Sequence, residues 1–139
     1  FRNGSYVIGV AGMITALQAI QFAKLPEPKK GLSNYDRFVS TVLIPAVVRL
    51  EEENEIEHGK SHYLMSFCDQ IYIVAGNNYY LNSRHSFNAV GSGGNYARAY
   101  LLGLGKDVYT EEDVLNALKV AAGVDHNSSG PFHIQKATK

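Results

Sequence analysis

The sequence has little of what would assign a function at once. Its 139 residues include one cysteine, Cys68, so an internal disulfide is excluded and a reducing compartment is expected. There is no C-x-x-C pair and no H-E-x-x-H, two spacings typical of zinc sites. No apolar run is long enough to cross a bilayer. We therefore expect a globular protein with no membrane partner and no metal or other cofactor.

Net charge is lacking too. Thirteen Lys and Arg balance thirteen Asp and Glu, and 45% of the residues are hydrophobic. A neutral chain has no overall field to attract nucleic acid or an anionic membrane, so neither partner is expected. The composition predicts one domain spanning residues 1–139, large enough to bury about two-thirds of the surface of its unfolded chain.

Hydrophobic periodicity predicts strands and helices in blocks. The expected strands cover 5–10, 62–68, 70–76, 79–81, 86–90 and 132–134, and the expected helices cover 16–23, 35–50, 95–104 and 111–122. Because the strands do not alternate one by one with helices, an α+β fold with helix pairs covering antiparallel sheet is favoured over a parallel sheet.

Several local signals refine the helices. Thr15 is expected to cap the first, with Leu17, Ile20 and Phe22 facing inward. Pro45 removes one backbone donor from the second and predicts a kink. The acidic tail at 51–57 is expected to be exposed. Thr110 and Asp113 have the spacing of a capping box at the start of the last helix.

The most informative stretch is the glycine-rich corner at 91–94. A strand pattern ends there, and a helical pattern begins at Asn95. Glycines permit a sharp turn, and the first amides of a helix favour anions, so Ser92 lies at an electropositive corner. Three interpretations are open: a plain turn, a phosphate cradle, or part of an active site. The cradle is the weakest, because neither phosphate-binding glycine motif is matched.

Two other polar turns are candidates for chemistry. One is the loop at 125–129, and the other is the strand-to-helix turn at Gly12, which offers a backbone amide. His58 and His62 are four residues apart, but Gly59 ends the helix between them, so a metal site is not expected there. Asp125 and His126 could suggest acid–base chemistry, but adjacent side chains in a loop rarely face each other, so this pair is not expected to act together.

Taken in order, these segments resemble the HslV and proteasome β-subunit family of N-terminal-nucleophile hydrolases. The stretch at 6–12 is similar to the strand and turn before that family's first helix. The stretch at 89–99 is close to an HslV segment in which proline is usual at position 95. The helix at 111–118 follows, and 125–130 resembles the proteasome's Asp-x-x-Ser-Gly-Gly loop, with Ser129 at the first glycine.

The resemblance implies a four-layer αββα sandwich, in which two antiparallel sheets are flanked by helix pairs. It implies that the Gly12 amide helps to stabilise an oxyanion, and that Ser92, Asp125 and Ser128 orient an α-amine that accepts a proton. By the same resemblance, Val10 and Ile14 line the pocket for the substrate side chain. The family's nucleophile is the first residue of the mature chain, a Thr.

Position 1 is a Phe, and it matches a family position that lies after the nucleophile. We therefore expect a segment before Phe1 in the natural protein. The implied function is a cytoplasmic threonine-type endopeptidase that degrades unfolded polypeptides. Its subunits would form rings of six or seven stacked in pairs, fed by an AAA+ ATPase unfoldase. The alternatives are a ring subunit that assembles without cleaving and an amidohydrolase of small amides.

Overall fold

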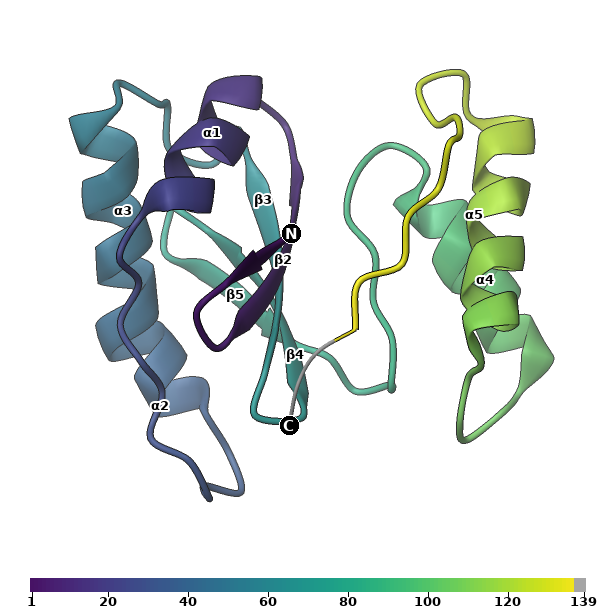
Figure 1. The fold of residues 1–139 in the computed structure, drawn as a ribbon, viewed down its shortest axis with the longest axis horizontal. Helices are drawn as coiled ribbons and strands as arrows, with labels where there is room; N and C mark the ends of the chain where they lie inside the picture. The colour runs from purple at the N-terminus through teal and green to yellow at the C-terminus, as the bar shows by residue number, and fades with distance from the viewer. Residues whose placement is uncertain (137–139) are drawn as a thin grey trace.

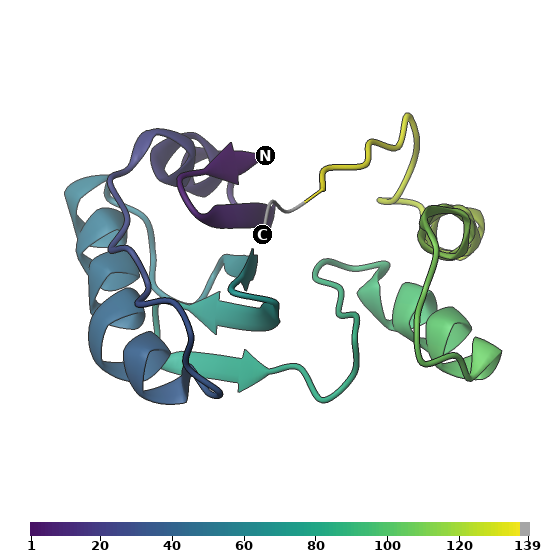
Figure 2. The ribbon, with the colours of Figure 1, turned by 60° about the horizontal axis from the view of Figure 1, so that its bottom comes forward.

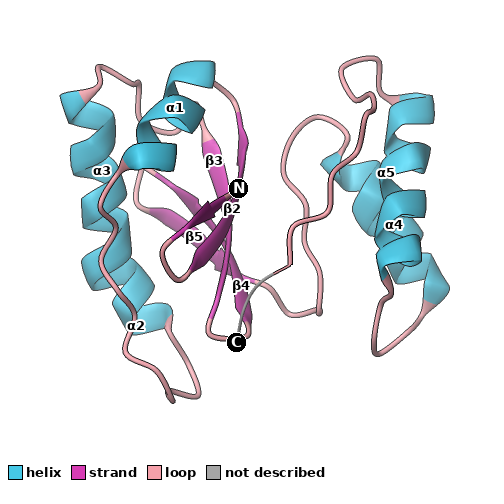
Figure 3. Ribbon diagram, in the orientation of Figure 1, coloured by secondary structure: helices cyan, strands magenta, loops and turns pink. Residues whose placement is uncertain are grey.

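One antiparallel sheet of five strands forms the centre of the computed structural model, which describes residues 1–136. The strands are β1 (Arg2–Asn3), β2 (Tyr6–Ala11), β3 (His62–Phe67), β4 (Gln70–Ala75) and β5 (Tyr79–Asn82), and they lie side by side in chain order (Figures 1 and 3). The turn between β3 and β4 has positive φ at Cys68 and Asp69, which suits a two-residue hairpin. The strands expected at 5–10, 62–68, 70–76 and 79–81 are therefore confirmed to within two residues.

One face of this sheet carries the larger hydrophobic core. Ile8 pairs with Met65 and Met65 pairs with Tyr72, so the three side chains are aligned across the strands, and all are buried. Helix α1 (Ile14–Phe22) and a longer helix cover them (Figure 2). The rest of the cluster includes Tyr6, Ala16, Ile20, Tyr35, Val39, Leu43, Val47, Tyr63 and Phe67.

Helix α1 differs from the prediction at both its start and its buried face. It begins at Ile14 after Met13, which makes no side-chain cap, so Thr15 is a helical residue and not the cap. Ile20 is buried, but Phe22 is 85% exposed. Two residues along a helix turn the side chain by about 200°, so Phe22 cannot share the face of Ile20. Its predicted inward position was wrong.

The longer helix is interrupted next to Pro45, where a kink was expected. It consists of α2 (Asp36–Phe38), a π-helical turn η1 (Val39–Leu43) and α3 (Ile44–Glu53). The amide of Ile44 donates to the carbonyl of Val39, five residues earlier, and this wide turn lies directly before Pro45, which has no amide to donate.

A π-helical turn contains one more residue than an α-helical turn, and this rotates the buried face of the helix. Leu43, Ile44, Val47 and Glu51 are therefore inside, whereas Val42 is 41% exposed. The prediction that Glu51 is exposed was wrong.

A second helical layer lies on the other side of the sheet (Figures 1 and 2). Helices α4 (Gly94–Leu104) and α5 (Glu111–Val124) pack on each other around Leu101, Ala117 and Ala121. The predicted capping box is confirmed: the Thr110 side chain accepts from the Asp113 amide, and the Asp113 side chain accepts from the Thr110 amide.

The α+β class is confirmed, but no second sheet is present among residues 1–136. The stretch at 86–90, expected as a strand, is irregular. Side chains bind its backbone instead of a neighbouring strand: the Ala89 amide donates to Asn88 Oδ1 at 2.8 Å, and Arg98 Nη1 donates to the Ala89 carbonyl at 2.5 Å. The stretch at 132–134 is also irregular, so both strand predictions were wrong.

The segment after α5 returns toward the sheet (Figure 1). Arg2 donates to the carbonyl of Lys136, and Lys136 Nζ lies 2.6 Å from Glu111 Oε1. Residues 125–136 therefore connect the second helical layer to the outermost strand.

Candidate functional site

Glycines shape the turn that presents Ser92. Gly91 has φ +100°, and its carbonyl accepts from the Gly94 amide at 3.0 Å. A Cβ on Gly93 would lie 2.4 Å from Ser128 Oγ and 3.2 Å from the Ala121 methyl. Only a glycine therefore allows the start of α4 to approach the end of α5 this closely.

This approach brings together three of the predicted site residues. Ser92 Oγ and Ser128 Oγ each donate to Asp125 Oδ2 at 2.6 Å, although Ser92 is 33 residues away in sequence. The backbone amide of Asn127 lies 3.4 Å from Asp125 Oδ1. The hydrogen bond from Ser128, which has the larger effect, and the one from Ser92 lower the pKa of Asp125 below its ordinary value of 3.8. The carboxylate is therefore ionised at neutral pH.

Gly12 directly follows β2 and lies next to the same corner. Its φ is +129°, and a Cβ there would lie 2.5 Å from the Lys60 carbonyl oxygen and 2.7 Å from Ser61 Oγ. A Cβ on Gly91 would lie 3.5 Å from the Ala11 methyl, so the two glycine bends are neighbours. Gly12 is exposed. The structure thus brings Gly12 close to the turn that carries Ser92.

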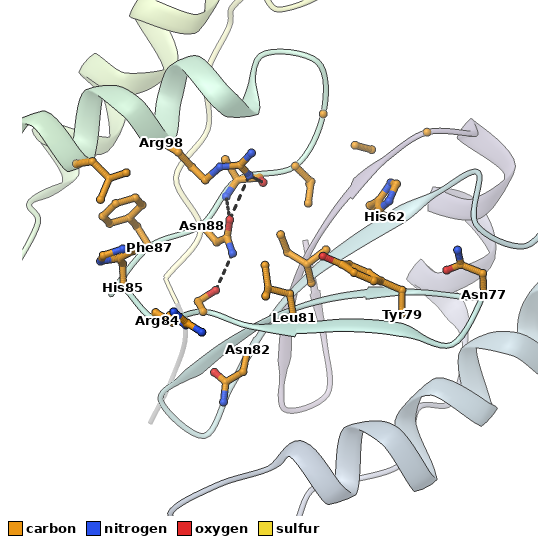
Figure 4. Close-up of a pocket in the computed structure, with 18 of the residues that line it drawn as sticks. His62, Asn77, Tyr79, Leu81, Asn82, Arg84, His85, Phe87, Asn88 and Arg98 are labelled. Carbon is orange, nitrogen blue, oxygen red and sulfur yellow. Dashed lines mark hydrogen bonds between the residues drawn. The ribbon is translucent and has the colours of Figure 1, made fainter.

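A cavity of about 870 Å³ opens between the sheet and α4, and both Gly12 and Gly91 line it. Figure 4 shows His62 and Tyr79 on the sheet side, with Asn88 and Arg98 opposite them. Arg98 Nη1 lies 3.3 Å from Asn88 Oδ1, and Asn88 Nδ2 donates to Ser83 Oγ at 2.8 Å. The lining also includes Lys60, Arg84 and His85 and contains no Asp or Glu. The wall is therefore neutral to basic.

The two residues expected to contact the substrate side chain, Val10 and Ile14, lie two residues on either side of Gly12 but outside the lining of the cavity. Val10 is half-buried and packs on the core beneath α1, and Ile14 is 70% exposed at the first residue of that helix. Neither lines the cavity.

Sequence reasoning missed Ser61 and Arg98. The fully buried Ser61 accepts from the Met13 amide at 3.1 Å, across 48 residues, so no local pattern could indicate it. Arg98 holds the loop that precedes Ser92. The signal in the sequence was the position of Arg98, about one turn into the helix that follows the glycine-rich corner at 91–94.

The arrangement suits binding of a cationic nitrogen. Both serine hydroxyls donate to one carboxylate oxygen, so the remaining lone pairs on the hydroxyls and carboxylate can accept from an ammonium or amine. Residues 1–136 contain no group of three His, Cys, Asp or Glu side chains placed to hold a metal. Within the same residues, no helix is both long and apolar enough to cross a membrane.

No protein-family model and no curated protein matches the chain. Solved structures do match it. BPH from Thiobacillus denitrificans, bound to epoxomicin, is 22% identical with a TM-score of 0.70, and the match covers 94% of this chain and 74% of that one. BPH alone is 20% identical with a TM-score of 0.68 and the same coverage.

HslV from Trypanosoma brucei is 22% identical with a TM-score of 0.57, and the match covers 91% of this chain and 72% of that one. Both kinds of neighbour match the chain over most of its length. The protein therefore has an HslV and proteasome β-subunit-like fold.

Proposed function

We propose that the protein is a subunit of a threonine-type peptidase of the HslV and proteasome kind. The observation that carries the proposal is the contact of Ser92 and Ser128 with one ionised carboxylate, Asp125, beside the exposed Gly12 turn. The structures with this fold include a BPH bound to epoxomicin.

In this proposal the nucleophile is a Thr that precedes residue 1 in the intact protein. Its hydroxyl oxygen attacks the peptide carbonyl carbon, and its own α-amine takes the hydroxyl proton. The resulting ammonium then gives the proton to the leaving amine, and water hydrolyses the ester that remains. An α-amine has a pKa of about 8, so it can accept a proton near neutral pH.

Each site residue has a defined task in that reaction. Ser92, Asp125 and Ser128 accept hydrogen bonds from the α-amine and fix its orientation. The Gly12 amide donates to the oxyanion as the tetrahedral intermediate forms. Val10 and Ile14 flank the Gly12 turn, and in the proposal they contact the substrate side chain beside the scissile bond.

The finer architecture belongs to the same proposal. A second sheet, added to the single one among residues 1–136, would complete the four-layer sandwich. The subunits would assemble in the cytoplasm into stacked rings of six or seven, and an AAA+ ATPase would supply unfolded polypeptide. Closed ring symmetry would restrict the site to chains without folded structure.

The test compares two glycine substitutions in the intact gene product. Gly93→Ala places a methyl against Ser128 Oγ and separates the two serines from Asp125, whereas Gly103→Ala, in α4, meets nothing within 4 Å. A displacement of about 1 Å can cost roughly 100-fold in rate. We expect Gly93→Ala to lower kcat on a fluorogenic peptide by about that factor and Gly103→Ala to leave it unchanged.

Labelling with epoxomicin, followed by mass spectrometry, identifies the reacting residue. Modification of the first residue of the mature chain supports the proposal. A wild-type protein that forms rings but neither cleaves peptide nor reacts is the non-cleaving ring subunit instead. Hydrolysis of small amides by a protein that forms no ring in electron micrographs would identify the amidohydrolase.

A further inference from the structure

The turn that presents the Gly12 amide is held by one buried hydroxyl outside the proposed catalytic set. Ser61 has no solvent exposure, and its Oγ accepts from the Met13 amide at 3.1 Å. A Cβ on Gly12 would lie 2.7 Å from Ser61 Oγ and 2.8 Å from Ser61 Cα. Ser61 is therefore packed directly against the glycine and bonded to the residue that follows it.

The strand pairing explains why the turn needs this bond. The ladder between β2 and β3 ends at the pair of Ala11 with His62. Beyond that pair, the chain at Gly12 leaves the sheet with a φ of +129°, and glycine has wide conformational freedom. The bond from the Met13 amide to Ser61 restrains the peptide plane between Gly12 and Met13, so it fixes the backbone at the turn.

Ser61 itself lies on a well-anchored segment. The Ile56 amide donates to the carbonyl of Glu51 at 2.8 Å, and the Ile56 side chain is buried. His58 Nδ1 lies 3.3 Å from Glu51 Oε2. These contacts fasten the connection between α3 and β3 to the helix, so the hydroxyl is presented from a fixed position.

We propose that Ser61 is a positioning residue for the oxyanion amide of Gly12, an inference that rests on the peptidase function proposed above. Ser61 does not touch the substrate. It holds the Met13 amide, and the bend held in this way directs the Gly12 amide toward the carbonyl oxygen of the scissile bond as that oxygen gains charge.

The experiment replaces the hydroxyl in the intact protein. Ser61→Ala removes the acceptor, Ser61→Cys keeps a weak one of similar size, and Ser66→Ala changes a half-buried serine on β3, the strand that follows Ser61. Loss of an oxyanion donor costs about 100-fold or more in kcat, and a misaligned donor costs less. We expect Ser61→Ala to lower kcat roughly 10-fold to 100-fold with KM within about twofold, Ser61→Cys to recover part of it, and Ser66→Ala to match wild type.

Two further measurements separate positioning from a general structural role. The affinity for a peptide aldehyde, which forms a tetrahedral adduct, should fall by the same factor as kcat/KM. Amide hydrogen exchange at Met13 should become faster in Ser61→Ala, whereas exchange in β4 should not change.

The outcomes distinguish this inference from the function on which it rests. An active wild type whose Ser61→Ala variant keeps its kcat overturns the positioning role alone. Unchanged exchange at Met13 in Ser61→Ala overturns the bond that the role requires. A wild-type protein without peptidase activity overturns the proposed function, and the positioning role with it.

Discussion

At the scale of single residues, two carboxylates in this protein have opposite environments. Asp125 receives two serine hydroxyls, and its pKa is lowered. Glu51 is fully buried, and burial raises its pKa despite contacts with His58 and Tyr63. A Cβ on Gly76 would lie 2.3 Å from Glu51 Oε1, so glycine at that position leaves room for the carboxylate. Burial therefore opposes the charge on Glu51, and hydrogen bonding favours it on Asp125.

The raised pKa of Glu51 predicts a pH dependence of stability. A native pKa above the ordinary value of 4.5 means that the folded protein binds the proton more tightly than the unfolded chain does. The contribution to stability is therefore complete below pH 4.5 and is lost as the pH rises through the native pKa. Glu51→Gln cannot ionise, so its stability should lack this decline.

Urea unfolding of both proteins at several values between about pH 4 and pH 8 measures the difference. The stability of Glu51→Gln relative to wild type should rise with pH across the lower part of this range. Glu53→Gln, at an exposed position of the same helix, is the control. A constant difference between Glu51→Gln and wild type at every pH would contradict the prediction.

At the scale of elements, the helix caps show where local sequence decides structure. The Asp113 amide donates to Thr110 Oγ1 at 3.2 Å, and the Thr110 amide donates to Asp113 Oδ2 at 2.9 Å. This reciprocal pair involves two residues three apart, and its pattern can be recognised without the fold. The first helix has no such pair, because Met13 precedes it.

Removing the cap of α5 should destabilise the protein measurably. Thr110→Ala leaves the Asp113 amide without its acceptor, and the loss of such a cap costs about 1 kcal/mol. Thr15→Ala, at an exposed helical position of α1, should be neutral or slightly stabilising, because Ala is the better helix former. The free energy of unfolding in urea measures both. Equal effects of the two substitutions would show that Thr110 does not act as a cap.

Sequence patterns predicted most helices and strands, and they failed where contacts between residues far apart in the sequence determine the local structure. The helices expected at 95–104 and 111–122 and the meander at 62–81 are present, because periodicity and turn residues act over a few positions. The buried position of Glu51 depends on the π turn next to Pro45, which shifts the helical phase. The irregular 86–90 segment depends on Arg98, which bonds its backbone from α4.

The site was predicted in part for the same reason. Resemblance placed Ser92, Asp125 and Ser128 together, and the hydrogen bonds agree. In the sequence, α1 and α3 lie between the Gly12 turn and Ser61. Only the fold therefore brings the Ser61 hydroxyl into contact with that turn.

At the scale of the whole molecule, the residues divide between two hydrophobic clusters. The larger fills the space between the sheet and α1–α3, and the smaller lies between α4 and α5 with Phe87. The cavity of about 870 Å³ separates the sheet from α4. Because the smaller cluster buries fewer side chains, the α4–α5 layer should open more readily than the sheet.

Hydrogen exchange in two matched variants tests this division. Leu101→Ala removes a buried side chain from the smaller cluster, and Leu43→Ala removes one from the larger; each change costs about 2–5 kcal/mol at its own site. We expect Leu101→Ala to speed exchange in α4 and α5 while β3 and β4 stay protected, and Leu43→Ala to speed exchange in the sheet. Equal acceleration everywhere in both variants would indicate one cooperative unit.

The order of the strands also sets the order in which the chain can assemble. β3, β4 and β5 pair across short turns, so this meander can form as soon as its own residues are available. The pairing of β2 with β3 must instead enclose residues 12–61, which carry α1 and α3. Closing that long loop is the slow entropic step, and it is the step that brings the Met13 amide, next to Gly12, to Ser61. The proposed oxyanion turn would thus mature late in folding, after the meander of β3, β4 and β5 and together with the pairing of β2.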